Sequence, residues 1–169
     1  MAKNQGKKFE QAVKESFDKV EDISVDRIPD QVTKYKGSTN ICDFTVYKFP
    51  LMFYLECKSV HGNTISIYSE PKLGKDGKLY GFYGNIRDNQ WDGLLEKSKI
   101  FGVRAGVIIW WIDKDVTKYY PIEVLEKLRN EVGLKSVRYD YNDVRAITLT
   151  GEKKRVYYDY DMGRFLRLF

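Results

Sequence analysis

The stretch ICDFTVYKFPLMFYLECK, residues 41–58, decides the fold that this chain can adopt. Residues 41–48 and 51–58 both alternate in the way that β-strands do. The dipeptide Phe49-Pro50 lies between them, at the place of a turn. The stretch therefore predicts an antiparallel hairpin that reverses at this dipeptide.

The expected register of the hairpin brings two acidic residues together. If the hairpin is symmetric about its turn, Asp43 lies opposite Glu56, with Cβ atoms about 4.5–5.5 Å apart. Lys58 shares the face of Glu56, because side chains in a strand repeat every two residues. A shift of one residue in the register would separate the two carboxylates.

Two acids and a lysine in this arrangement are suited to phosphodiester hydrolysis. Opposed carboxylates repel, and one takes up a proton unless a cation lies between them. Mg²⁺ prefers oxygen ligands and typically uses one or two carboxylates besides water and substrate phosphate. Such an ion polarises a phosphoryl oxygen and lowers the pKa of a bound water, while Lys58 could orient that water or offset charge on phosphorus. The pattern is loose, so a surface hairpin with an exposed Glu–Lys pair is the alternative.

Length, composition and charge fit a single globular domain with an anionic partner. The chain has 169 residues, a net charge of +5 and a pI near 9.0, and we treat residues 1–169 as one domain. The longest apolar run, residues 105–112, is far shorter than the roughly 20 residues that span a bilayer. The first eight residues are polar and basic and do not form a signal peptide, so we expect a cytoplasmic protein.

Hydrophobic periodicity predicts the remaining elements. The pattern indicates helices over residues 7–20, 88–101 and 122–132, and strands over residues 63–68, 103–112, 144–150 and 155–160. Residues 23–31 form either a short strand or an irregular connector. Residues 151–154 should join the last two strands, and a short helix should follow them. In the helix over 88–101, Asp88 or Asn89 is the expected cap and Phe101 belongs to the buried side.

The two cysteines, Cys42 and Cys57, should be reduced core residues in a cytosolic chain. The symmetric hairpin makes them cross-strand partners on the face away from the acids. Two cysteines and one histidine do not have the spacing of a zinc site.

Five segments, in the same order along the chain, resemble the PD-(D/E)xK nuclease superfamily and within it the RecU-type Holliday junction resolvases, in a phage-like form. The resemblance covers roughly residues 5–120. The segments are Gly6-Lys7-Lys8-Phe9-Glu10, Ser38-Thr39 with Asp43, Glu56-Cys57-Lys58, Asn63-Thr64-Ile65-Ser66, and Asn85-Ile86-Arg87-Asp88-Asn89-Gln90. The chain departs from RecU proteins in having only residues 21–42 between the first helix and Asp43, too few for their long stalk. Cys42, and not proline, precedes Asp43, although many members of the superfamily also lack that proline.

The resemblance implies a fold, a site and a substrate. The expected fold is α/β, a restriction-endonuclease-like core with a mixed β-sheet flanked by helices. The expected site has Asp43 and Glu56 as Mg²⁺ ligands (Mn²⁺ may substitute as a metal), Lys58 positioning the attacking water, Glu10 as a further metal-linked acid, and Gln90 as a supporting residue. The implied enzyme is a homodimeric endonuclease that nicks four-way DNA junctions in recombination and repair, in a bacterial cell or a phage-infected host.

Two alternatives stay open. One is a nuclease of the same superfamily that cuts duplex, flap or forked DNA. The other is a DNA-binding protein that has lost catalysis, although a binding module has no need for acids where phosphate must approach.

Basic segments on either side of the acids are the candidates for DNA contact. The loop of residues 33–40 precedes Asp43, and residues 68–84 form an insertion rich in Gly, Lys and Tyr that we interpret as a loop or hairpin. The candidate DNA-binding residues are Lys34, Lys36, Ser38, Lys72, Lys75 and Lys78.

Overall fold

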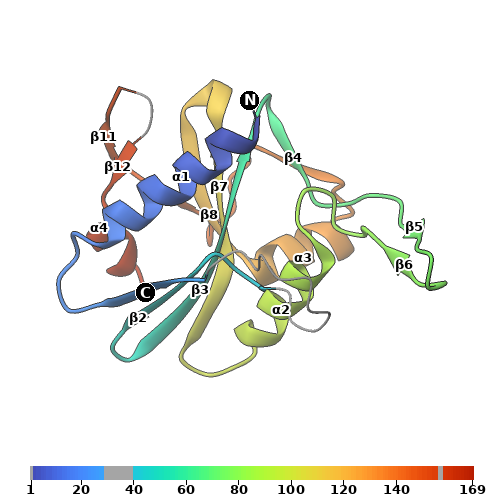
Figure 1. Cartoon of the computed structure of the whole chain (residues 1–169), viewed down its shortest axis with the longest axis horizontal. Helices are drawn as coiled ribbons and strands as arrows, with labels where there is room; N and C mark the ends of the chain where they lie inside the picture. The colour runs from blue at the N-terminus through green and yellow to red at the C-terminus, as the bar shows by residue number, and fades with distance from the viewer. Residues whose placement is uncertain (1, 29–39, 156–157) are drawn as a thin grey trace.

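The computed structural model describes residues 2–28, 40–155 and 158–169 (Figure 1). Three of the candidate DNA-binding residues, Lys34, Lys36 and Ser38, lie outside the described residues. No helix in the described part is long and apolar enough to cross a membrane.

A mixed six-stranded sheet forms the centre of the described structure. Only β3 and β7 run parallel, and the connection between them carries a helix, as parallel neighbours require. The other neighbours in this sheet are antiparallel. The strand order is β1 (Ser24–Arg27), β2 (Phe44–Lys48), β3 (Leu51–Val60), β7 (Val103–Trp111), β8 (Val116–Pro121) and β10 (Ile147–Thr148).

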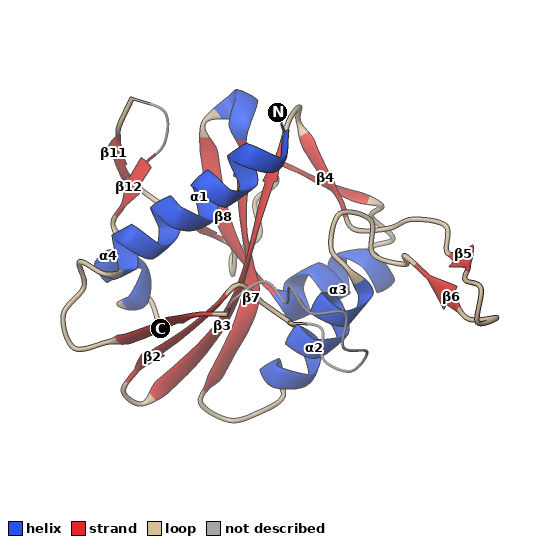
Figure 2. Ribbon diagram, in the orientation of Figure 1, coloured by secondary structure: helices blue, strands red, loops and turns tan. Residues whose placement is uncertain are grey.

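Helices cover both faces of the sheet (Figure 2). On one face lie α1 (Ala2–Phe17) and α4 (Met162–Leu166), and on the other lie α2 (Asp88–Ser98) and α3 (Ile122–Asn130). A short 3-10 helix, η1 (Ile112–Lys114), follows β7. The predicted α/β class, with a mixed sheet flanked by helices, is confirmed.

The two faces have separate hydrophobic cores because strand side chains alternate. Phe9 and Phe17 of α1 pack with Phe44 and Phe53 of the sheet. Trp91 of α2 belongs to the other core, with side chains from α3 and β7. Burying both faces makes β7 apolar almost throughout, which is why its sequence has no alternation.

Three two-stranded sheets are described around this core. They are β4 (Thr64–Ser66) with β9 (Ser136–Arg138), β5 (Lys72–Leu73) with β6 (Leu79–Tyr80), and β11 (Gly151–Lys153) with β12 (Tyr158–Tyr160). The expected turn over residues 151–154 is wrong, because residues 151–153 pair as a strand with β12.

The hairpin of β2 and β3 has the predicted register. Lys48 pairs with Leu51 and Phe44 with Leu55, so the symmetry about the turn at residues 49–50 is confirmed. The regular ladder ends at Phe44, and the backbone bends at residues 41 and 43. The N–H of Asp43 donates to the carbonyl oxygen of Leu55 at 3.1 Å. The ladder therefore does not pair Asp43 with Glu56, as the symmetric register predicted.

This bend explains why the predicted cysteine pairing is wrong. Both thiols are buried and free, as expected. Cys42, however, packs in the core that contains Trp91, whereas Cys57 packs in the core that contains Phe9, on the other face of the sheet. Strand alternation cannot be extended through residues that have left the strand.

Both ends of α2 also differ from the expectation. The N-cap residue of α2 is Arg87, and Asp88 is the first residue of the helix. The helix ends at Ser98, and a turn at residues 99–102 leaves Phe101 fully exposed instead of buried. Gly102 has φ +80°, a left-handed conformation that glycine adopts readily after a helix.

Candidate active site

Three elements position the candidate catalytic side chains. Glu56 and Lys58 project from β3 toward α2, two residues apart on one face. Asp43 lies at the entrance to β2, and Gln90 lies in the first turn of α2. The structure thus brings together four of the five candidate catalytic residues.

Glu56, Lys58 and Gln90 form a closed hydrogen-bonded triangle. The Oε1 atom of Glu56 accepts from Lys58 Nζ at 2.7 Å and from Gln90 Nε2 at 2.6 Å. Lys58 Nζ also donates to Gln90 Oε1 at 3.0 Å. Glu56 is 2% exposed and Gln90 1%, so the triangle is inside the protein and its geometry is fixed by packing as well as by hydrogen bonds.

The first turn of α2 holds Gln90 in place. Its Oε1 atom also accepts from the backbone N–H of Arg87 at 3.3 Å, one of the N–H groups that a helix start leaves without a partner in the helix. The side chain of Gln90 faces inward and binds both members of the Glu56–Lys58 pair.

The backbone of β3 fixes Asp43 beside Glu56. The N–H of Cys57 donates to Asp43 Oδ2 at 2.7 Å, so the carboxylate of Asp43 is bound one residue along the strand from Glu56. Burial, and after it the negative charge of Glu56, raise the pKa of Asp43 to about 7, although the Cys57 N–H and the charge of Lys58 act to lower it. Glu56 is therefore close enough to Asp43 to oppose its ionisation.

Burial likewise raises the pKa of Glu56, although Lys58 and then Arg87 oppose this with positive charge. Arg87 is exposed at the start of α2, and the sequence analysis did not assign it to the site. The only sequence signal was its position immediately before the expected helix. Its charge makes it a candidate for contact with phosphate.

The residues present fit a hard divalent cation. The Oε2 atom of Glu56 is buried and has no hydrogen-bond donor among the described residues. Two carboxylates against one ammonium leave the pocket with excess negative charge, which a cation would offset. The described residues contain no group of three or more His, Cys, Asp or Glu side chains placed to hold a metal ion. Mg²⁺ typically uses only one or two protein carboxylates, with water and substrate phosphate as its other ligands.

Glu10, the fifth candidate, approaches from the other face of the sheet. It lies on α1, and its Oε2 atom accepts from Arg27 Nη2 of β1 at 2.7 Å. Its negative charge contributes to raising the pKa of Cys57, the neighbour of Glu56, so it lies within electrostatic reach of the acid pair. The sequence analysis did not find Arg27, because no local pattern links β1 to α1.

The described lysines among the DNA-binding candidates lie apart from the acids. Lys72, Lys75 and Lys78 are exposed on the hairpin of β5 and β6, which projects from the rest of the structure (Figure 1). Of the two expected forms, a loop or a hairpin, the structure has the hairpin. Contact with DNA stays a prediction.

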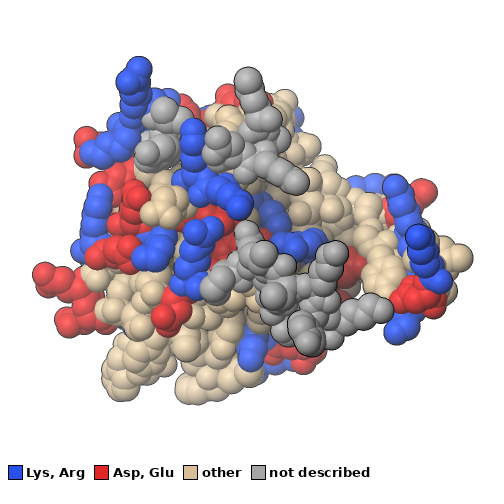
Figure 3. Space-filling view, in the orientation of Figure 1, with Lys and Arg blue, Asp and Glu red and all other residues tan. Residues whose placement is uncertain are grey.

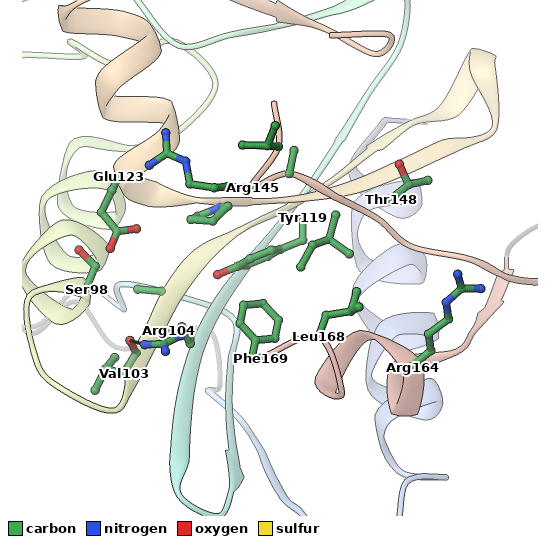
Figure 4. Close-up of a pocket in the computed structure, with 15 residues that line it drawn as sticks. Ser98, Val103, Arg104, Tyr119, Glu123, Arg145, Thr148, Arg164, Leu168 and Phe169 are labelled. Carbon is green, nitrogen blue, oxygen red and sulfur yellow. Dashed lines mark hydrogen bonds between the residues drawn. The ribbon is translucent and has the colours of Figure 1, made fainter. Parts of the chain in front are cut away.

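A separate cavity of about 720 Å³ lies beside the start of β7 and the C-terminal residues (Figure 4). Tyr119, Arg104 and Phe169 are among its lining residues. Arg104 pairs with Phe53 in the sheet, near the turn end of β3, whereas Glu56 pairs with Val107 further along. None of the candidate site residues lines this cavity.

Comparisons with known proteins identify a similar fold at low sequence identity. No protein-family model matches the chain, and no curated protein matches it in sequence. Among solved structures, the fold is similar to that of Hjc from Archaeoglobus fulgidus, a Holliday junction resolvase from an archaeal hyperthermophile. The TM-score is 0.45 and the identity 13%, over 70% of this chain and 78% of that one.

Proposed function

We propose that this protein is a metal-dependent DNA endonuclease that resolves four-way junctions by paired nicks. The observation that carries the proposal is the buried acid pair. Asp43 and Glu56 are held side by side, Glu56 Oε2 has no donor among the described residues, and Lys58 is bound to the other oxygen of Glu56. A protein that only bound DNA would gain nothing by placing two buried acids where a phosphate must approach.

Asp43 and Glu56 would hold the metal ion, with Mg²⁺ as the natural choice and Mn²⁺ as a substitute. When bound there, such an ion polarises a phosphoryl oxygen and lowers the pKa of a water molecule. The N–H of Cys57 and the side chains of Lys58 and Gln90 keep the two carboxylates in fixed positions for this role.

Lys58 is the residue that we assign to the reacting atoms. Its ammonium group is held by Glu56 and Gln90, yet the side chain is 18% exposed, so one N–H can still reach a ligand. That N–H would orient the attacking water or donate to a phosphoryl oxygen as negative charge develops on it. Gln90 acts through Glu56 and Lys58, and Glu10 would act through its charge from the opposite face.

The charge around the site suits a polyanionic substrate. The chain carries a net charge of +5 despite its central acids. Lys and Arg side chains gather with acidic ones between them on the face shown in Figure 3. Contacts from such side chains to phosphates position DNA without reading its sequence.

The preference for a four-way junction and the RecU-type relationship rest on the motif resemblance along residues 5–120. A junction has two-fold symmetry and requires two coordinated cuts, so we propose a homodimer in which each copy of residues 1–169 acts as one nuclease domain.

A gel assay with three labelled substrates tests the proposal. A four-way junction, a fork and a linear duplex of shared sequence are incubated with the protein in Mg²⁺ or in EDTA. We expect symmetric nicking of the junction in Mg²⁺ and none in EDTA. Binding without cutting in Mg²⁺ would overturn the enzymatic assignment, and equal cutting of all three substrates would overturn the junction preference.

A further inference from the structure

The hairpin of β5 and β6 projects from the rest of the structure, and its own backbone hydrogen bonds hold its strands and its turn together. The backbone N–H of Gly74 donates to the carbonyl oxygen of Lys78 at 2.7 Å, and that of Gly77 to Gly74 at 3.1 Å. At the other end, the N–H of Ser69 donates to the carbonyl oxygen of Phe82 at 3.1 Å and closes the hairpin. We call residues 69–82 the arm.

The tip of the arm exposes apolar side chains that a soluble surface normally avoids. Leu73 and Leu79 are register partners, so their side chains lie next to each other on one face of the hairpin. They are 71% and 50% exposed, and Tyr80, on the opposite face, is 48% exposed. A two-stranded hairpin this short gains little stability from such residues, so their exposed surface is free to contact a partner.

The arm also carries a small excess of positive charge, because its three lysines outnumber its two acids, Asp76 and the exposed Glu70. Lys72, Lys75 and Lys78 are exposed, and the acid between them, Asp76, already accepts hydrogen bonds from the Tyr80 hydroxyl at 2.5 Å and the Lys78 N–H at 3.2 Å. Three cations around an apolar pair match a partner that offers both negative charge and flat apolar surfaces. A nucleic acid offers phosphates and base faces.

The base of the arm is joined to the helix that supplies Gln90. The carboxylate of Asp88 accepts from the N–H groups of Gly81 at 2.7 Å and Phe82 at 2.9 Å. Just beyond the arm, the ring of Tyr83 stacks on Trp91 of α2, with centroids 4.6 Å apart and 3° between the planes. Asp88 and Gln90 are in the same helical turn, so the arm has a fixed origin beside the acid pair.

We propose that the arm is the branch-binding element of this protein. Leu73 and Leu79 pack on base faces at the branch point of DNA, and Lys72, Lys75 and Lys78 bind the flanking phosphates. In a regular duplex the base faces are covered by stacking, whereas at a branch they open to an apolar wedge. The inference rests on the proposed nuclease function of the acid pair, and it assigns the selectivity for branched DNA to the arm.

Fluorescence anisotropy of the full-length protein in EDTA tests the assignment without cleavage. The probes are a four-way junction and a linear duplex of equal length and shared sequence. For the double variant Leu73→Ser, Leu79→Ser we expect about tenfold weaker binding to the junction and unchanged binding to the duplex, because the duplex has the same kind of ends as the junction but no branch point with open base faces.

A second variant separates charge from apolar contact. In the triple variant Lys72→Ala, Lys75→Ala, Lys78→Ala we expect weaker binding to both probes. The slope of log affinity against log salt should fall by about 0.9 for each phosphate contact that is lost. The matched control is Ile100→Ser, Phe101→Ser, which removes two exposed apolar residues on the loop after α2 and should change neither affinity.

Two results would overturn the inference. One is junction binding by the leucine variant as tight as that of the wild type. The other is an equal loss on junction and duplex. Cleavage by the wild type in Mg²⁺ is measured in parallel. If the wild type cuts nothing, the nuclease proposal fails, whatever the arm binds. If it cuts the junction and the leucine variant retains full selectivity, only the arm assignment fails.

Discussion

Two hairpins in this protein have similar local geometry and opposite surroundings. The hairpin of β2 and β3 lies inside the central sheet, where Phe44, Phe53 and Leu55 are fully buried. The hairpin of β5 and β6 projects from the rest of the structure, with its apolar residues exposed. Both reverse the chain by antiparallel pairing, so their differences come from what packs against them.

The comparison shows that burial fixes the geometry of the side chains on a hairpin, whereas exposure makes them accessible to a partner. A buried hairpin can hold two carboxylates in opposition, because neighbours on both faces prevent the strands from moving apart to relieve the repulsion. An exposed hairpin cannot maintain such strain, but its side chains can reach a large partner. Catalysis requires the first property and recognition of a branched surface the second.

The largest expected effect concerns Lys58 in the buried hairpin. In Lys58→Ala, the ammonium group that we assign to the reacting atoms is lost, and we expect junction cleavage in Mg²⁺ to fall by about 10³-fold. Binding in EDTA should stay largely intact. Single-turnover gel assays measure the rate, with Lys99→Ala, an exposed lysine paired with Glu96, as the control. Normal cutting by Lys58→Ala would refute the site assignment.

The next effect compares the stability contributed by each hairpin. Phe53→Ala should cost about 3–5 kcal/mol, because it leaves a cavity in a fully buried position. The ring of Phe53 lies 6.1 Å from that of Phe165 and 5.1 Å from that of Phe169. Leu73→Ala on the arm should change stability by less than about 0.5 kcal/mol. Urea unfolding measures both, and similar midpoint shifts would contradict the contrast between the hairpins.

A smaller effect is expected at Gln90, which supports the acids from α2. Gln90→Ala removes one hydrogen bond from Glu56 and one from Lys58, and we expect the cleavage rate to fall about 10–100-fold, as for other residues that orient metal ligands. The Mg²⁺ concentration for half-maximal rate should rise. Gln11→Ala, an exposed glutamine on α1, is the control and should leave both quantities unchanged. A reduced rate with an unchanged Mg²⁺ requirement would argue against a role through Glu56.

The smallest expected effect is on the free energy of unfolding, and it arises from the repulsion between Asp43 and Glu56. In metal-free protein at pH 8, Asp43→Asn should raise the free energy of unfolding by on the order of 1 kcal/mol, since a neutral amide replaces a buried charge beside Glu56. The pKa of Asp43 is raised to about 7 in the folded state, so the folded protein keeps this proton more tightly than the unfolded chain. Wild-type stability should therefore fall as pH rises from about 4 to about 7, and the advantage of the variant should vanish near pH 4.

Thermal unfolding with and without Mg²⁺ completes that test. Mg²⁺ should stabilise the wild type at pH 8, because it binds the folded state, and should stabilise Asp43→Asn less. Equal stabilisation of both proteins would place the ion elsewhere.

Much of the site could be predicted from the sequence because it depends on local rules. The register of β2 and β3 followed from a symmetric turn, and the shared face of Glu56 and Lys58 followed from strand alternation. The motif resemblance pointed to Gln90, and the structure places it against both residues. Where the chain leaves regular structure, the same rules failed: the bend before Phe44 separated Cys42 from Cys57, and the turn after Ser98 exposed Phe101.

The sequence by itself determined the elements that alternate or repeat, and with them the register of β2 and β3 and the shared face of Glu56 and Lys58. Only the tertiary structure decided how that pair is held: Gln90 from a distant helix closes the triangle, Arg27 binds Glu10, and one oxygen of Glu56 is left buried without a donor among the described residues. The reason is physical. Backbone periodicity is a property of neighbouring residues, whereas burial and hydrogen-bond partners depend on which segments the folded chain packs together.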